Sequence, residues 1–360
     1  MSMTNHTPPR SSFEFIFHGT GSSSSLPNIT CLTSKPVTCE TCASTLTPEG
    51  EKNKRRNTGG VVRMRGSMSG PSSERVLVID VGKTFLAAAL DLFPQHDLRR
   101  IDAVLLTHGH ADAVNGLDDL RTWTLGKNRI QDHIDVYLSA ETMQVINRSF
   151  PYLVSKEHAT GSGNVAEFKW YIIEENQPFK IGGLDIDITP VAVHHGWLAP
   201  HKRSNEIGSN GHQREAPLTV PEPYMCFGFM FADILIYMSD VSYIPDTAWE
   251  VISARSGSFE AFVVDCLRIE HHISHYGIKE VVEATKRINS KRTYVVGFGH
   301  EIPHVGWEAI GKRIRGDDVG EVRPLVQQAL ERLSELGIGD EGVWVQPAYD
   351  GQVLALGRNI

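Results

Sequence analysis

The sequence has few cysteines, no long apolar run and no strong excess of either charge. Five cysteines in 360 residues are a small and odd number, so we do not expect a disulfide framework. The N-terminal stretch MSMTNHTPPR lacks the apolar h-region of a secretory signal. The longest apolar run in the next hundred residues, 85–90, is far too short to span a bilayer. We therefore expect a cytoplasmic protein with no membrane partner.

The composition is that of a soluble globular protein with a mildly acidic balance. Hydrophobic residues make up 41% and charged residues 22%, which excludes a wholly disordered, collagen-like or coiled-coil chain. Lysine and arginine number 35 against 43 acidic residues, a formal net charge of −8, so nucleic acid is not an expected partner. A KNKRR run at 52–56 allows the nucleus as a second location, although a solvated loop explains it better.

Strands occur in runs, and helices lie between the runs rather than after every strand. This order is not that of a doubly wound Rossmann fold, and it favours two sheets packed face to face with helices outside. The clearest expected elements are strands over 76–79, 103–106 and 261–264 and a helix over 278–288. Two segments near the end, 343–345 and 353–356, are expected to form a closing hairpin.

The chain is expected to form a single domain over residues 13–358, preceded by a disordered segment over 1–12. Two polar stretches interrupt this domain. The first, near 50–74, is rich in Ser, Gly, Arg and Lys, and the second, near 201–222, is a polar loop with Gly and Pro. Both are predicted to be surface insertions.

Histidine and aspartate side chains follow three apolar strands directly. The first strand runs into His108-x-His110-x-Asp112. His195 follows a second strand, and Asp240 follows a third. Neutral imidazole and carboxylate are the ligand types that zinc and similar divalent metals take. Together the three strand ends predict a metal site, although Asp112 alone is equally compatible with a helix cap.

Further short motifs accompany these strand ends. They are Asp80-x-Gly82, Gly19-Thr-Gly-Ser22, Gly116-Leu-Asp-Asp-Leu-Arg121, Tyr237–Pro245, Asp265-Cys-Leu-Arg268 and Tyr349-Asp-Gly351. As a set, these motifs resemble the metallo-β-lactamase superfamily and, within it, most closely the phosphoribosyl cyclic-phosphate phosphodiesterase group. The resemblance runs from about Phe13 to Leu356 apart from the two insertions, and it is more specific for the fold than for the substrate.

The resemblance implies a four-layer αββα sandwich of the α+β class, with a metal site at one edge of the two sheets. It assigns the first metal to His108, His110 and His195. Asp240 would bridge two metals where two are bound, and Asp112 would serve the second metal and catalysis. A metal-bound hydroxide would attack phosphorus, because a metal lowers the pKa of bound water from ~15.7 to ~7. Zinc or manganese is the expected cofactor.

Two positions depart from the family pattern, and both belong to the second metal. Ala113 stands where the family usually has a histidine, and Gly297 stands where the bacterial enzymes carry another. We therefore expect one active-site ion, with a weakly held second ion as the alternative. His304 is a candidate substitute ligand for that second ion.

The resemblance also implies a structural metal site and a general acid. Cys31, Cys39, Cys42 and His300 would form a structural zinc tetrahedron that pins an N-terminal loop to a C-terminal strand. Reduced thiols without a metal are the alternative. His275 corresponds to the group's proposed general acid, since an imidazole suits protonation of a leaving oxygen near neutral pH. A plain surface or packing role is the alternative for this histidine.

These inferences predict a metal-dependent hydrolase that acts on a small or cyclic phosphodiester. Hydrolysis of an ester or thioester on the same fold is the first alternative, and a weakly active or non-catalytic metal-binding relative is the second. A nuclease role is disfavoured by the acidic balance and by the lack of a long basic arm. The expected partner is a small-molecule phosphodiester, and a homodimer is left open as the oligomeric state.

Overall fold

A computed structural model of the chain describes residues 12–65, 74–161, 164–184, 186–198, 221–255 and 257–357. The segment 1–12, expected to be disordered, lies outside the described residues apart from Ser12, which begins the first strand. The insertion expected near 201–222 lies outside them apart from its last two residues. For these two segments the expectation stays a prediction.

In the part of the chain that the structure describes, thirteen strands form two sheets. The first sheet runs in the order β13 (Val353–Leu356), β1 (Ser12–Gly19), β2 (Gly59–Arg65), β3 (Glu74–Ile79), β4 (Ala103–Leu105), β5 (Ile134–Leu138) and β6 (Phe168–Ile172). The second runs in the order β12 (Val345–Pro347), β11 (Thr293–Val296), β10 (Ala261–Asp265), β9 (Leu235–Met238), β8 (Pro223–Phe231) and β7 (Ile188–Trp197). Each sheet mixes parallel and antiparallel pairs, so crossovers and hairpins both occur.

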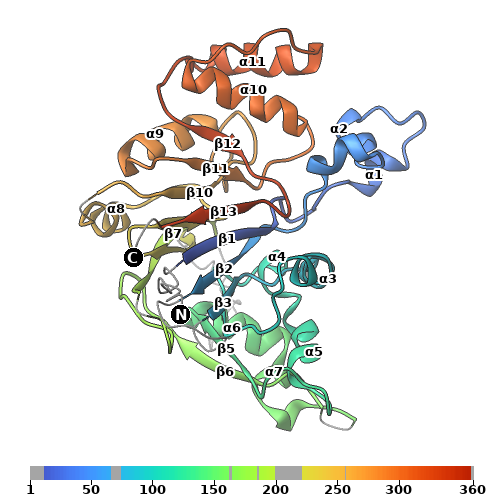
Figure 1. The fold of residues 1–360 in the computed structure, drawn as a ribbon, viewed down its shortest axis with the longest axis vertical. Coiled ribbons are helices and arrows are strands. Elements are labelled where there is room, and N and C mark those ends of the chain that lie inside the picture. Colours follow the sequence, from blue (N-terminus) through green and yellow to red (C-terminus); the bar gives the residue numbers. More distant parts are fainter. Residues whose placement is uncertain are drawn as a thin grey trace, which may run out of the picture.

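Helices cover the outer face of each sheet (Figure 1). On the first sheet lie α3 (Phe85–Gln95), α4 (Ala111–Val114), α5 (Arg121–Thr124), α6 (Ala140–Ser149) and α7 (Pro151–Val154). On the second lie α8 (Asp246–Ser253), α9 (Ile278–Ile288), α10 (His304–Arg315) and α11 (Pro324–Glu335). The short helices α1 (Ile29–Leu32) and α2 (Glu40–Ser44) project from one side, and short 3-10 helices span Pro48–Asn53, Leu117–Leu120 and Lys156–His158. No helix of the described segments has both the length and the apolarity to cross a membrane.

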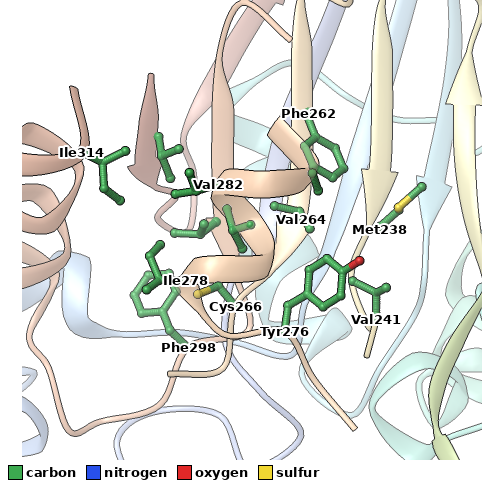
Figure 2. Close-up of a cluster of buried hydrophobic side chains, with 14 of the residues drawn as sticks. Met238, Val241, Phe262, Val264, Cys266, Tyr276, Ile278, Val282, Phe298 and Ile314 are labelled. Atoms are coloured by element: carbon green, nitrogen blue, oxygen red, sulfur yellow. The ribbon is translucent and has the colours of Figure 1, made fainter. Parts of the chain in front are cut away.

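Three apolar layers hold these elements together because strand side chains alternate between the two faces. In β1, Phe15 points into the core between the sheets, while Ile16 packs under the helices of the first sheet. In β10, Val263 faces the other sheet, while Phe262 and Val264 pack against α9 (Figure 2). The expected four-layer αββα sandwich of the α+β class is therefore confirmed, as one domain.

Two expectations about local structure are wrong. Over its described part, the segment near 50–74 is not a surface insertion, because β2 lies inside the first sheet and pairs with both β1 and β3. The closing hairpin does not form, because β12 pairs with β11 in the second sheet while β13 pairs with β1 in the first. For the expected hairpin, the local pattern identified both strands but not their neighbours in space.

Met64 in β2 offers a test of this corrected assignment. Its side chain is buried between the sheets, so Met64→Ala is expected to lower the free energy of unfolding by about 2–5 kcal/mol. Arg65, the next residue, is exposed and pairs with Glu74, so Arg65→Ala should cost no more than about 1 kcal/mol. Urea unfolding of both variants decides the matter. Equal and small effects would mean that β2 is not part of the core.

Candidate active site and thiol cluster

The predicted metal ligands come from strand ends in both sheets. His108 and His110 follow β4 of the first sheet, His195 lies near the end of β7, and Asp240 follows β9 of the second. The carboxyl ends of parallel strands meet at one edge of a sheet. Because two sheets contribute, the side chains meet where the two sheet edges adjoin.

The structure brings five of the predicted residues together. The imidazole centroids of His108, His110 and His195 lie 4.6, 5.3 and 5.2 Å apart, and the three rings offer nitrogen atoms within 4.8 Å of one another. Asp240 Oδ1 lies 3.8 Å from His195 Nε2 and 4.0 Å from His275 Nδ1. Three imidazoles and a carboxylate therefore converge on one space, with a fourth imidazole beside them.

Asp112 and His304 are placed differently. Asp112 lies on α4, close enough for Asp240 to raise its pKa in addition to the effect of burial, but it belongs to neither group of converging ligand atoms. His304 lies at the start of α10, against the Tyr349 ring and 3.3 Å from Glu308. His304 is therefore not a substitute ligand, and its candidacy for a second active-site ion is wrong.

Hydrogen bonds orient the His108 ring. The Thr107 backbone N–H and hydroxyl donate to the two carboxylate oxygens of Asp80, each at 2.8 Å. Because the Thr107 hydroxyl donates its hydrogen bond to Asp80, its oxygen accepts a hydrogen bond from His108 Nδ1 at 2.8 Å. The lone pair of His108 then resides on Nε2, which is buried and has no hydrogen-bond partner among the described residues. Such an arrangement presents the nitrogen to a metal.

The other two imidazoles are held from different sides. His195 Nδ1 donates to the Ser274 carbonyl at 2.8 Å, so His195 Nε2 also presents its lone pair to the cluster. The Tyr224 ring stacks on His110 at 4.6 Å and 13°, and its hydroxyl accepts from the Gly109 N–H at 3.2 Å. Sequence reasoning did not identify Tyr224, which lies at the start of β8 outside the quoted motifs.

The electrostatics of the cluster match a cation-binding site. Burial lowers the pKa of His108 to about 3, and burial also lowers that of His110, so both rings are neutral at pH 7. Burial and then the Asp240 charge raise the pKa of Asp112, and burial is likewise the main cause that raises the pKa of Asp80. Neutral nitrogen donors beside closely placed carboxylates are suited to a divalent ion, which would favour the ionised acids.

His275 is paired with a buried acid. Its Nδ1 lies 2.7 Å from Asp265 Oδ2, and Asp265 is completely buried. Burial lowers the pKa of His275, but Asp265 and then Asp240 outweigh burial and raise it to about 9. In the sequence, Asp265 is only part of the Asp265-Cys-Leu-Arg268 motif, and the structure pairs it with His275. The Asp265 carboxylate therefore favours the protonated imidazole and holds it by its Nδ1.

Asp265 also fills the space beside Gly297. A Cβ added to Gly297 would lie 2.5 Å from Asp265 Oδ1, and the glycine has φ +78°, which disfavours other residues. Asp265 Oδ1 has no hydrogen-bond partner within the described residues. A histidine at position 297 is therefore incompatible with the present position of Asp265.

A second group of potential ligands, which we call the thiol cluster, comprises Cys31, Cys39, Cys42 and His300. Their sulfur atoms lie 3.3, 3.4 and 3.7 Å from His300 Nδ1, and all five cysteines of the chain are free thiols. The backbone N–H groups of Asn28 and Cys42 donate to two of the sulfurs. Burial raises the pKa of Cys42 to about 12, and the neighbouring thiols add to this rise. Three sulfurs and one nitrogen fit the donor set of a tetrahedral zinc site.

Comparisons with known proteins agree with this geometry. Residues 75–298 match the model of the beta-lactamase superfamily domain. The crystal structure of a diphosphatase of the PhnP family superposes with a TM-score of 0.63 at 20% identity, over 96% of this chain and 97% of that one. Zn(2+)-bound PqqB from Methylobacterium extorquens superposes at 0.58 with 15% identity, over 95% and 99%. Both structures share the fold.

A curated relative matches along only part of its length. An octanoyltransferase from Porphyromonas gingivalis is 23% identical over 292 residues, which are 80% of this chain. The chain spans 46% of that relative, so a large part of the relative has no counterpart here.

Thr107 provides a test of the orientation of His108. Thr107→Val keeps the shape of the side chain but removes the hydroxyl between Asp80 and His108, so metal affinity at the imidazoles is expected to fall about 10–100-fold. Competition with a chromogenic chelator measures this. Thr122→Val is the matched control, since the Thr122 hydroxyl is exposed and bonds only to the Asp119 carbonyl. An unchanged affinity in Thr107→Val would contradict the proposed orientation.

Proposed function

The chain belongs to the metallo-β-lactamase superfamily, and from this premise we propose that it is a metal-dependent hydrolase of small or cyclic phosphodiesters. The observation that carries the proposal is the convergence of His108, His110 and His195 with Asp240 where the two sheets meet. The pairing of a protonated His275 with Asp265 beside this group supports the hydrolytic part. The motifs shared with the cyclic-phosphate phosphodiesterase group support the phosphodiester part.

We assign the active-site ion to His108, His110, His195 and Asp240. The orphaned, buried Nε2 atom of His108 and the outward-held Nδ1 atom of His195 support this assignment. Zinc and manganese both accept three nitrogens and one carboxylate oxygen. Such an ion polarises a phosphoryl oxygen and supplies a nucleophile from water at neutral pH. The protein's own contribution is to hold the imidazoles neutral and in fixed orientations.

The active site is proposed to hold one ion rather than two. Ala113 offers no ligand atom, and position 297 is closed to a larger side chain by Asp265. Asp112 lies close enough to Asp240 for the Asp240 charge to add to the rise of its pKa. Its proposed part in catalysis is to contact the substrate rather than to bind a second ion. One ion is sufficient for hydrolysis in zinc enzymes of other folds.

His275 is proposed to protonate the leaving oxygen. A general acid must carry its proton at working pH and lie close to the reacting group. The Asp265 carboxylate meets the first condition by raising the pKa of His275, against burial, to about 9. The position 4.0 Å from Asp240 supports the second condition. Asp265 thus acts through His275 as its positioning residue.

The thiol cluster is proposed to bind a structural zinc ion. Cys31 and Cys39 come from the α1–α2 region and His300 follows β11, so a zinc ion would join segments more than 250 residues apart in the chain. A bound metal would take the three sulfurs as thiolates and would contribute to folding.

Metal removal and one carboxylate substitution test the reaction class. Chelation is expected to reduce hydrolysis of bis(4-nitrophenyl) phosphate to background, and zinc or manganese should restore it. Asp240→Asn should stay at background even with added metal, because the ion loses its carboxylate. Asp246→Asn makes the same change at an exposed position on α8 and should leave activity unchanged. Hydrolysis of a carboxylic ester or thioester without any phosphodiester cleavage would instead support the first alternative.

The leaving group distinguishes a general acid from other roles of His275. A nitrophenolate leaves without a proton, whereas an alkoxide does not, so His275→Ala should slow an alkyl phosphodiester about 10²–10⁴-fold and the nitrophenyl ester much less. His271→Ala serves as control, because His271 is exposed and paired with Glu280 at 3.1 Å. An equal loss on both substrates would show that His275 does not supply the proton.

A further inference from the structure

Arg55 is a fully buried cation without an acidic partner. It is 0% exposed, and it is the largest side chain of the described residues that the fold buries completely. Its hydrogen bonds go to two carbonyl groups and one amide, and no described carboxylate forms an ion pair with it. Its Nε atom is buried without a partner in the described parts of the chain. Burial of an unpaired charge is costly, so this position requires a compensating negative charge.

The guanidinium of Arg55 holds the backbone directly before His300. Its Nη1 donates to the Phe298 carbonyl at 3.3 Å and to the Gly299 carbonyl at 2.5 Å. Its central carbon lies 4.1 Å from the centre of the Phe298 ring. Nη2 donates to Asn53 Oδ1 at 3.2 Å, so the two Nη atoms of the planar guanidinium bind different partners. These contacts fix the two residues that lead into a member of the thiol cluster.

The thiol cluster supplies the missing negative charge once it holds a divalent ion. Three deprotonated thiols outweigh the two positive charges of the ion, which leaves about one negative charge for Arg55 to offset. Burial lowers the pKa of Arg55 to about 9; the Asp350 charge opposes this effect, and so does Cys42 when its thiol is ionised. Asp350 accepts hydrogen bonds from Thr20 and from the Arg56 N–H rather than from the Arg55 guanidinium.

We propose that Arg55 is a positioning residue for the metal in the thiol cluster, which holds the His300 backbone and offsets the excess charge of the metal-bound thiolates. This inference rests on the structural zinc site proposed above. It explains why a strongly basic run at 52–56 contains a residue that never reaches solvent. It also implies that burial of Arg55 is more favourable when the cluster is loaded.

Zinc retention tests this role directly. In the full chain, Arg55→Met should weaken zinc binding at the thiol cluster about 10–100-fold, as removal of a residue that supports a ligand does. Arg55→Lys should lie between Arg55→Met and wild type, because it keeps the charge but not the fork. Lys54→Met removes the same charge from an exposed neighbour that pairs with Glu51, and it should not change zinc binding. Chelator competition gives the affinities, and circular dichroism checks that each variant is folded.

The sign of the stability change separates this role from ordinary packing. In zinc-loaded protein, Arg55→Met should lower the melting temperature. In a Cys42→Ser background freed of zinc, the same substitution should leave the melting temperature unchanged or raise it, because it removes an uncompensated buried charge. An equal destabilisation in both backgrounds would show that Arg55 serves only its carbonyl partners, and it would overturn the inference. If Arg55→Met does not fold, Arg55→Gln, which also removes the charge, gives the same comparison in the two backgrounds.

Failure of the inference can be told apart from failure of the zinc site. If the Cys42→Ser variant holds as much metal as the wild-type protein, the proposed zinc site itself is refuted. Wild type and Arg55→Met that both retain zinc equally tightly would leave the site intact and refute only the role of Arg55. The third result, weaker zinc binding confined to the Arg55 variants, is the one we expect.

Discussion

A buried imidazole nitrogen without a partner is the constraint around which the active site is built. His108 Nε2 has no hydrogen bond from any described residue, and an unsatisfied buried polar atom costs about 1–3 kcal/mol. Thr107 and Asp80 hold the ring in this orientation through three short contacts rather than letting it turn toward a partner. The fold therefore maintains an arrangement that is unfavourable in the protein alone, which is typical of a site shaped by its ligand rather than by stability.

A site made by two sheets requires that the sheets cannot slide past each other. The Gly297 N–H after β11 donates to the Thr20 carbonyl after β1 at 2.9 Å, which links the second sheet to the first. The Thr20 hydroxyl donates to Asp350 at 2.8 Å, and Asp350 also accepts from the Arg56 N–H. Asp350 lies where the chain passes from β12 in one sheet to β13 in the other. The first and last segments of the domain thus fix the relative position of the edges that carry the ligands.

Elements that local pattern determines could be predicted from the sequence, and elements that depend on neighbours could not. The helix over 278–288 and the β4 strand leading to His108 match the structure, because apolar periodicity and the following motif are local signals. The prediction of a closing hairpin is wrong, because the pattern of a strand does not indicate which sheet the strand joins. The helix α10 was missed, since Gly306 and Gly311 weaken its helical pattern while allowing close packing on Ile302 and β12.

Asp265 shows why a substitution pattern alone could not decide the nature of the site. In the sequence, glycine at position 297 indicates that a metal ligand of the family is missing. A missing ligand suggests a site that has lost its activity. A decayed site would be expected to leave an empty space beside this glycine. Here the Asp265 carboxylate occupies the space beside Gly297 and holds His275 in the active site. Glycine at position 297 therefore leaves room for the ordered pair of Asp265 and His275, which supports the proposed role of His275 rather than loss of the site.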